Sequence, residues 1–274
     1  MPQTRKMLPF DLVAFDLDGT LLDDRKDIPG SALGTIAALK ARGVLVSIAS
    51  GRAAYSCLEF GSRIGANAPL IAHNGSLVLS PDGSYLYHRA IPACTVARIL
   101  ALKPQGASAF FIQPDKVVHE EAPETHVRAI SAWGHRIYER VESLARAAVA
   151  DVTMLHMVGD RGALERVRED VGALPDVTAQ IYPSERFPLT HLEVRAGDDT
   201  KGTGLDRVST YTGVPRERIM AVGDWLNDLP MFEVAGISVA MKGAPGELLA
   251  LADFVTDAHA ADHGVNRFFA RFLD

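Results

Sequence analysis

The sequence is poor in cysteine, and its two cysteines, Cys57 and Cys94, are far apart. They form neither a disulfide framework nor the paired spacing of a zinc site, so we expect packing residues in a reducing compartment. No run of about 18 apolar residues occurs, which argues against a membrane-spanning helix. The basic residues at positions 1–6 are not followed by a long apolar segment, so a signal peptide is not expected. We therefore expect a cytoplasmic protein with no membrane partner.

An excess of positive charge is also missing. The 28 Lys and Arg residues against 34 Asp and Glu residues give a formal net charge of -6 at pH 7, and the basic residues are scattered. This argues against a nucleic-acid partner, because such proteins carry a clustered basic surface. What remains is an ordinary globular composition over 274 residues, long enough for one large or two modest domains.

The segment at residues 10–22 organises the chain. Its apolar residues 10–15 predict a short buried strand, which ends at Asp16 and Asp18 and is followed by Gly19. Ligands of open α/β sheets bind beyond the carboxyl ends of the strands, and alternate residues of a strand share one face. Two close carboxylates repel each other unless a cation or a shared proton intervenes, so we expect Mg²⁺ with a phosphate substrate. Taken alone, the pattern could equally be a polar turn after a strand.

Strands and helices alternate toward both ends of the chain. Apolar segments at 43–49, 69–73, 218–222, 236–241 and 254–256 predict strands. Helices are predicted at 29–42, from about 53 to 64, at 200–211, through Met231 and Phe232, and at 264–273. Such alternation is typical of a parallel sheet with right-handed crossovers. We therefore predict an α/β protein with a Rossmann-like parallel-sheet core.

The middle of the chain has a different pattern, with hairpins and antiparallel pairs among its helices. We interpret residues 84–190 as an inserted α+β cap domain. Residues 1–83 and 191–274 then form a discontinuous core. For the cap, Arg128, Arg186 and His191 could contact the substrate, but we interpret them as exposed surface charge.

Polar residues of complementary kinds follow the predicted core strands. Beyond Asp16 and Asp18, they are Ser50, Gly51, Asn74, Gly75, Lys201, Asp224, Asn227 and Asp228. Each has a structural alternative: serine, asparagine and aspartate often cap helices, and a lone lysine is usually solvated. Arg52 could be only a salt-bridge partner, and Trp225 is interpreted as packing beside the site in preference to forming a platform for the substrate.

This set, in this order, resembles the haloacid dehalogenase superfamily of Mg²⁺-dependent phosphatases. The matching motifs are Asp16-Leu17-Asp18-Gly19-Thr20, Ser50-Gly51-Arg52, Lys201, and Gly223-Asp224 with Asn227-Asp228. The large insertion after the second motif resembles the Cof-like group, whose α/β cap is of type IIB. The chain departs from that group at Gly243-Ala244, where Asn-Ala is usual, and at Leu249, where a lysine is usual.

The resemblance implies a role for each residue. Asp16 would form an aspartyl phosphate, and Asp18 would act as general acid and base. The side chains of Asp16 and Asp224 and the backbone carbonyl of Asp18 would hold Mg²⁺, with Asp228 anchoring its waters. A final set would bind the phosphate or the rest of the substrate: Ser50, Gly51, Asn74, Gly75, Lys201 and Asn227.

The predicted function is hydrolysis of small phosphorylated metabolites, with sugar phosphates as the family-level substrate and nucleotide-precursor and pyridoxal phosphates as further candidates. A phosphomutase that uses the same aspartyl phosphate is one alternative, and a non-catalytic phospholigand-binding protein is another. The sequence leaves the oligomeric state open.

Overall fold

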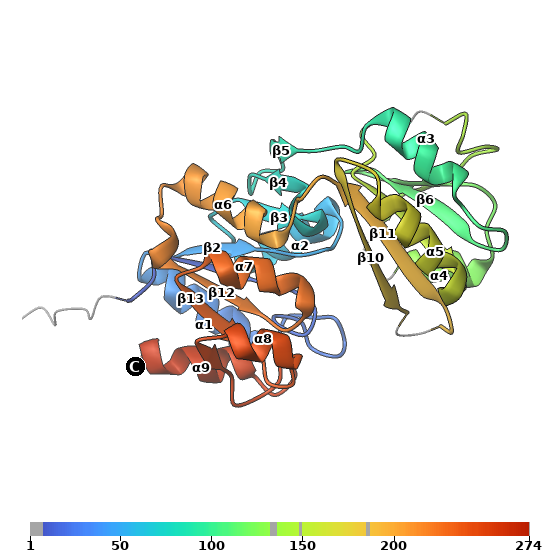
Figure 1. Cartoon of the computed structure of the whole chain (residues 1–274). Helices are drawn as coiled ribbons and strands as arrows, with labels where there is room; N and C mark the ends of the chain where they lie inside the picture. The colour runs from blue at the N-terminus through green and yellow to red at the C-terminus, as the bar shows by residue number, and fades with distance from the viewer. Residues whose placement is uncertain (1–7, 132–135, 148–149, 185–186, 274) are drawn as a thin grey trace, which may run out of the picture.

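The computed structural model describes residues 8–131, 136–147, 150–184 and 187–273, which form two regions with separate sheets (Figure 1). The first region is built on a five-stranded sheet with the order β14-β13-β12-β1-β2. All its pairings are parallel, which confirms the predicted α/β core. Its strands are β1 (Leu12–Phe15), β2 (Leu45–Ile48), β12 (Ile219–Gly223), β13 (Ile237–Ala240) and β14 (Phe254–Val255).

Helices cover both faces of this sheet, as its nearly continuous apolar strands require. Val13 and Phe15 of β1 point to one face, and Leu12 and Ala14 point to the other. The helices on the first face are α1 (Gly30–Ala41), α2 (Ala54–Ile64) and α9 (Gly264–Leu273). Those on the second face are α6 (Lys201–Thr212), α7 (Leu229–Val234) and α8 (Gly246–Leu251).

The strand predicted at 69–73 joins this sheet only at its edge. β3 (Leu70–Ala72) contacts the end of β2 through one parallel bridge, between Ala49 and Ile71. The turn η1 (His73–Gly75) then reverses the chain, and β3 pairs antiparallel with β4 (Leu77–Leu79). β4 pairs in turn with β5 (Tyr85–His88), so these strands form a small second sheet of the first region.

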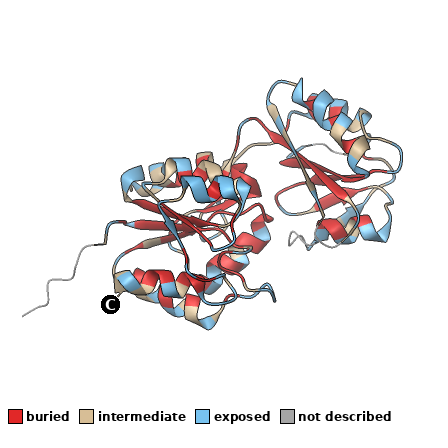
Figure 2. Ribbon diagram, turned by 60° about the horizontal axis from the view of Figure 1, so that its bottom comes forward, coloured by how far each residue is buried: buried red, intermediate tan, exposed pale blue. Residues whose placement is uncertain are grey.

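The second region is an α+β unit around a six-stranded sheet with the order β10-β11-β9-β6-β7-β8. Helices α3 (Ala93–Ala101) and α5 (Arg161–Gly172) pack on one face, and α4 (Glu124–Ser131) packs on the other. Its strands are β6 (Ser108–Ile112), β7 (Val117–His119), β8 (Tyr138–Arg140), β9 (Met154–Gly159), β10 (Val177–Pro183) and β11 (Thr190–Ala196). Figure 2 shows that each region buries its own interior.

The sheets suggest limits for the insertion that differ from residues 84 and 190. β5 belongs to the first region because it pairs with β4, whereas β11 pairs with β9 and β10 in the second. We therefore propose that the cap begins after His88 and ends at Ala196. None of the helices in the described part of the chain is both long and apolar enough to cross a bilayer.

Candidate active site

The polar residues that follow β1, β2 and β12 meet at the carboxyl edge of the parallel sheet. Asp16 follows β1 directly, and Lys201 is the first residue of α6. Lys201 Nζ lies 2.6 Å from Asp16 Oδ1 and 2.6 Å from Asp228 Oδ1. All three side chains are buried, so this ion-pair cluster forms the floor of the candidate site.

Local structure fixes the positions of both Lys201 and Asp228. Thr200 caps α6 by accepting a hydrogen bond from the backbone N–H of Thr203, which sets Lys201 at the start of the helix. The other carboxylate oxygen of Asp228 accepts the backbone N–H groups of Asp224, at 2.9 Å, and of Trp225, at 3.0 Å. The turn after β12 therefore holds Asp228 in place before any ligand binds.

A carboxylate cluster at this floor fits a divalent cation. Asp16, Asp224 and Asp228 each present an oxygen, and these oxygens lie within 4.8 Å of one another. Burial, together with the charges of Asp228 and Asp224, raises the pKa of Asp16 well above its usual range despite the nearby Lys201. Burial and the charge of Asp228 raise the pKa of Asp224 to about 6. The positive charge of Lys201 offsets only one of the three negative charges of these carboxylates, and Mg²⁺ would offset the other two.

Asp18 lies at the mouth of the site, where its side chain is 41% exposed. Its carboxylate accepts hydrogen bonds from Arg52 Nε at 2.6 Å, Arg52 Nη2 at 2.8 Å and Lys26 Nζ at 2.8 Å. Burial alone would raise the pKa of Asp18, but these two cations lower it to about 2. The salt-bridge role of Arg52 is confirmed, whereas Lys26 was not predicted.

Gly19 brings the first motif against Asp224. Its φ of +78° lies in the left-handed region, and a Cβ at this position would be 2.2 Å from Asp224 Oδ2. Thr20 adds a hydrogen bond of 3.0 Å from its hydroxyl to Asp224 Oδ1. The first motif thus orients Asp224 as well as supplying Asp16.

Replacement of Gly19 by alanine should displace Asp224. We expect a loss of about 1–2 kcal/mol of stability from the left-handed backbone and a loss of at least roughly tenfold in activity from the moved carboxylate. Gly43→Ala is the matched control, because Gly43 has φ +87° but no heavy atom within 4 Å of the added Cβ. Urea unfolding should show similar destabilisation of both variants. Phosphate release should fall in Gly19→Ala alone. Equal activity of the two variants would contradict this role for Gly19.

Several of the predicted phosphate-binding residues contact one another or neighbouring backbone groups, and most of them are buried. Ser50 Oγ accepts the backbone N–H of Arg52 at 3.2 Å. Asn74 Oδ1 accepts from Asn227 Nδ2 at 3.0 Å, and the Asn74 side chain lies against Gly51, whose added Cβ would be 3.0 Å from Asn74 Nδ2. At Gly75, a Cβ would be 2.0 Å from the backbone oxygen of Thr200. The Asn74–Gly75 turn therefore packs directly against the start of α6.

Glu193 and Arg195 of β11 extend these contacts into the cap, and sequence reasoning missed both. They form a buried ion pair, with Arg195 Nε 2.9 Å from Glu193 Oε1, which also accepts from Asn74 Nδ2 at 3.2 Å. Arg195 Nη1 donates to the backbone oxygen of Asn74 at 3.3 Å. The available signal was a pair of charges on one face of an apolar strand.

Two interpretations of single residues are wrong. Trp225 is 59% exposed, so its side chain is not a packed one. His191 is buried, with Nδ1 2.9 Å from His156 Nε2, instead of lying on the surface. Arg128 is exposed as expected, and Arg186 lies outside the described residues.

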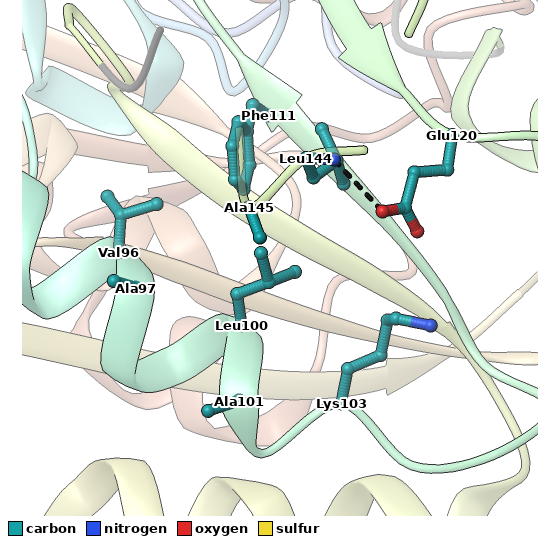
Figure 3. Close-up of a pocket in the computed structure, with 9 residues that line it drawn as sticks. All are labelled: Val96, Ala97, Leu100, Ala101, Lys103, Phe111, Glu120, Leu144 and Ala145. Atoms are coloured by element: carbon teal, nitrogen blue, oxygen red, sulfur yellow. Dashed lines mark hydrogen bonds between the residues drawn. The ribbon is translucent and has the colours of Figure 1, made fainter. Parts of the chain in front are cut away.

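A cavity of about 300 Å³ lies within the cap, away from these carboxylates (Figure 3). Val96 and Leu100 of α3 and Phe111 of β6 line it, and Glu120 Oε1 accepts the backbone N–H of Leu144 at 2.9 Å. None of the predicted site residues lines this cavity, so it is not the candidate active site.

Residues 13–269 match the family model of the haloacid dehalogenase-like hydrolases. Together with the parallel-sheet core and the carboxylate floor, this match shows that the chain belongs to that family. Within the family it is a phosphatase of the Cof-like group with a type IIB cap.

This chain aligns with individual relatives over nearly the full length of both proteins. A 5-amino-6-(5-phospho-D-ribitylamino)uracil phosphatase of Bacillus subtilis is 31% identical over 96% of this chain and 97% of its own. An HMP-PP phosphatase of Citrobacter koseri is 26% identical over 96% of both chains. A solved sugar phosphatase of subclass IIB is 25% identical with a TM-score of 0.80, covering 96% of this chain and 98% of its own.

Proposed function

We propose that the protein hydrolyses phosphomonoesters of small metabolites with Mg²⁺, through an aspartyl phosphate on Asp16. One observation carries this proposal: the Asp16 carboxylate is buried between Lys201 and two further carboxylates at the carboxyl end of β1. A nucleophile, a fixed cation and a set of metal ligands therefore converge on one point. Transfer of a phosphoryl group requires these three kinds of group.

Mg²⁺ would be held by the side chains of Asp16 and Asp224 and the backbone carbonyl of Asp18, and Asp228 would anchor its waters. When bound, the ion supplies positive charge that offsets the negative charge of the transferring phosphoryl group. Lys201 and Ser50, with the backbone at Gly51, hold the phosphoryl oxygens by charge and hydrogen bonding. Asn74, Gly75 and Asn227 act as positioning residues, in keeping with their mutual hydrogen bonds and close packing.

The reaction has two steps. Asp16 attacks phosphorus, so that a bond forms from Asp16 Oδ to phosphorus as the bond to the leaving oxygen breaks, and Asp18 donates a proton to that oxygen. Water then attacks phosphorus and gives a proton to Asp18. The phosphorus–oxygen bond to Asp16 breaks, which releases phosphate and restores the carboxylate. Asp18 must leave Arg52 and Lys26 to act as an acid, because their charge holds it ionised.

The substrate class is the finer part of the proposal. Sugar phosphates remain the family-level prediction, and the names of the relatives add a phosphoribitylaminouracil and HMP-PP. The phosphomutase stays an alternative that a requirement for a sugar bisphosphate would reveal. A cytoplasmic location and the absence of a nucleic-acid partner also stay predictions from the sequence.

Phosphate release from a panel of sugar, nucleotide and cofactor monophosphates, with Mg²⁺ and with EDTA, tests the proposed function. We expect release that needs Mg²⁺ and no added bisphosphate. Transfer of the phosphoryl group to a sugar would support the mutase. Ligand binding without any release or transfer would support the binding protein.

Mg²⁺ should stabilise the protein more at pH 8 than at pH 5. An ion at about 100 times its Kd adds about 2.7 kcal/mol, or an increase in Tm of roughly 5–10 °C. The pKa of Asp224, raised to about 6, means that this carboxyl largely retains its proton at pH 5, where the proton competes with the ion, and the raised pKa of Asp16 acts in the same direction. Thermal unfolding with and without Mg²⁺ at each pH measures the effect. Asp224→Asn is the control that should lose most of it, and an equal shift at both pH values would contradict the assignment.

A further inference from the structure

The buried ion pair of Glu193 and Arg195 on β11 has partners on both sides of the boundary between cap and core. Arg195 Nη1 donates to the backbone oxygen of Asn74 at 3.3 Å and to that of Asp199 at 3.0 Å. Glu193 Oε1 accepts from Asn74 Nδ2 at 3.2 Å, and Glu193 Oε2 accepts from the Tyr182 hydroxyl at 3.2 Å. Glu193 is 1% exposed and Arg195 is 4% exposed, so water does not compete for these contacts. A strand of the cap therefore binds the core turn η1 through two buried charges.

The turn that this pair binds has an unfavourable backbone conformation. His73 has φ +48° and Asn74 has φ +52°, so two consecutive residues with side chains lie in the left-handed region. Such conformations persist where the surrounding structure holds them. Glu193 and Arg195 both bind Asn74, and His73 Nδ1 lies 2.9 Å from Thr153 Oγ1, which also belongs to the cap. The contacts that hold η1 therefore come in part from the cap.

The turn η1 in its place supports the predicted phosphate-binding loop. The backbone N–H of Asn74 donates to the backbone oxygen of Ser50 at 3.1 Å, and that of His73 donates to the backbone oxygen of Arg52 at 3.1 Å. Gly51 lies between these two bonds and against the Asn74 side chain, where an added Cβ would be 3.0 Å from Asn74 Nδ2. A shift of η1 would therefore move the loop, and a misplacement of about 1 Å can cost roughly 10²-fold in rate.

We propose that Glu193 and Arg195 are positioning residues for the hydrolysis, which act through Asn74 to align the loop from Ser50 to Arg52 with the transferring phosphoryl group. The inference rests on the proposed function and makes that site depend on the cap, because the loop is fully held only while β11 lies against η1. Groups that bind the phosphoryl oxygens act most strongly in the transition state. Misalignment of the loop should therefore lower kcat more than it raises KM.

Removal of both charges tests this role without leaving one of them buried alone. Glu193→Leu combined with Arg195→Met keeps apolar side chains of similar size, and replacement of a whole buried ion pair in this way often leaves stability unchanged. For the panel ester with the highest kcat/KM, we expect kcat to fall roughly tenfold and KM to change by less than about twofold. Circular dichroism and thermal unfolding check that the variant is folded.

A second variant keeps the charge and serves if the double variant does not fold. In Arg195→Lys the single ammonium can still pair with Glu193, but it lacks the planar fork that reaches Asn74 and Asp199 at the same time. We expect kcat to fall roughly threefold, since the loop is less well aligned.

An ion pair within the cap provides the matched control. Lys116 Nζ lies 2.7 Å from Glu139 Oε2, and Lys116→Met combined with Glu139→Leu removes this pair by the same kind of substitution. We expect the wild-type kcat, because these two side chains bind each other and not η1.

The substitutions in an Asn74→Gly background separate positioning from a purely structural role. Glycine tolerates the left-handed backbone at this position but has no amide for Glu193 or for Asn227. If the pair acts through Asn74, the further loss of kcat on replacing Glu193 and Arg195 should shrink from roughly tenfold to about twofold. A structural role would instead give losses that multiply.

The outcomes separate the positioning role from the proposed function. Wild-type kcat in the double variant or, where that variant does not fold, in Arg195→Lys would overturn the positioning role while the hydrolase stands. An undiminished loss in the Asn74→Gly background would do the same. If the wild-type protein releases no phosphate from any ester of the panel with Mg²⁺, the proposed function itself fails, and the positioning role fails with it.

Discussion

Asp16→Asn should lower phosphate release by about 10⁴-fold or more, since removal of a covalent nucleophile eliminates the reaction path that depends on it. Asparagine has nearly the same size and shape as aspartate, but its amide lacks the negative oxygen that attacks phosphorus. The variant should stay folded, because Lys201 keeps its partner Asp228 and one buried negative charge is removed. Single-turnover and steady-state phosphate assays, with circular dichroism and thermal unfolding, measure both properties.

Asp11→Asn is the matched control for this substitution. Asp11 directly precedes β1, is exposed and pairs with Arg218 at 2.7 Å, outside the site. We expect near wild-type turnover, since exposed ion pairs contribute little. If Asp16→Asn retained a tenth of the wild-type rate, Asp16 could not be the nucleophile.

Lys201→Met should produce the largest loss of stability. The substitution keeps an unbranched side chain of similar length but leaves Asp16, Asp224 and Asp228 close together with no cation between them. Breaking a buried pair in this way costs about 3–5 kcal/mol. The rate should fall by roughly 10²–10³-fold, because a fixed positive charge on the phosphoryl oxygens is lost.

The stability loss in Lys201→Met should also depend on pH. Without the ammonium, Asp224, whose pKa burial already raises to about 6, takes up a proton near pH 5, which relieves the repulsion, and the raised pKa of Asp16 acts in the same direction. At pH 8 these carboxyls must ionise. Stability should therefore fall as pH rises from 5 to 8, and Mg²⁺ should restore part of it. Urea unfolding at both values measures the effect, with Lys242→Met, at an exposed lysine, as control. A loss below about 1 kcal/mol, typical of surface changes, would contradict the buried cluster.

Much of the core could be predicted because its strands are apolar runs bounded by glycine and polar residues. The elements that were missed lack this pattern. β8 has only three residues, Tyr138–Arg140, none of them buried, and α8 has six. The antiparallel pairing of β3 depends on where η1 reverses the chain, and the unusual backbone at Asn74, with φ +52°, gives no periodic signal. Such features arise from tertiary context, which a local pattern does not record.

The candidate site was predictable to the extent that it consists of residues at strand ends. Asp16, Asp224 and Asp228 come together because the parallel strands β1 and β12 finish at one edge of the sheet, and Lys201 reaches them from the start of α6. The binding of Asp18 by Lys26 was not predictable, since Lys26 lies in a loop with φ +60° and its reach depends on that loop. Glu193 and Arg195 belong to a strand of the cap, so their link to Asn74 could not be read from the core motifs.

The most direct test of the central claim is to identify the phosphorylated residue. Wild-type protein is mixed with excess substrate and Mg²⁺, quenched in acid within milliseconds and reduced with borohydride, which converts an aspartyl phosphate to homoserine. Peptide mass spectrometry then locates the product. We expect homoserine at position 16, none in Asp16→Asn, and none when substrate is omitted. Rapid phosphate release with Asp16 unmodified at every quench time, or homoserine at another aspartate, would contradict the account.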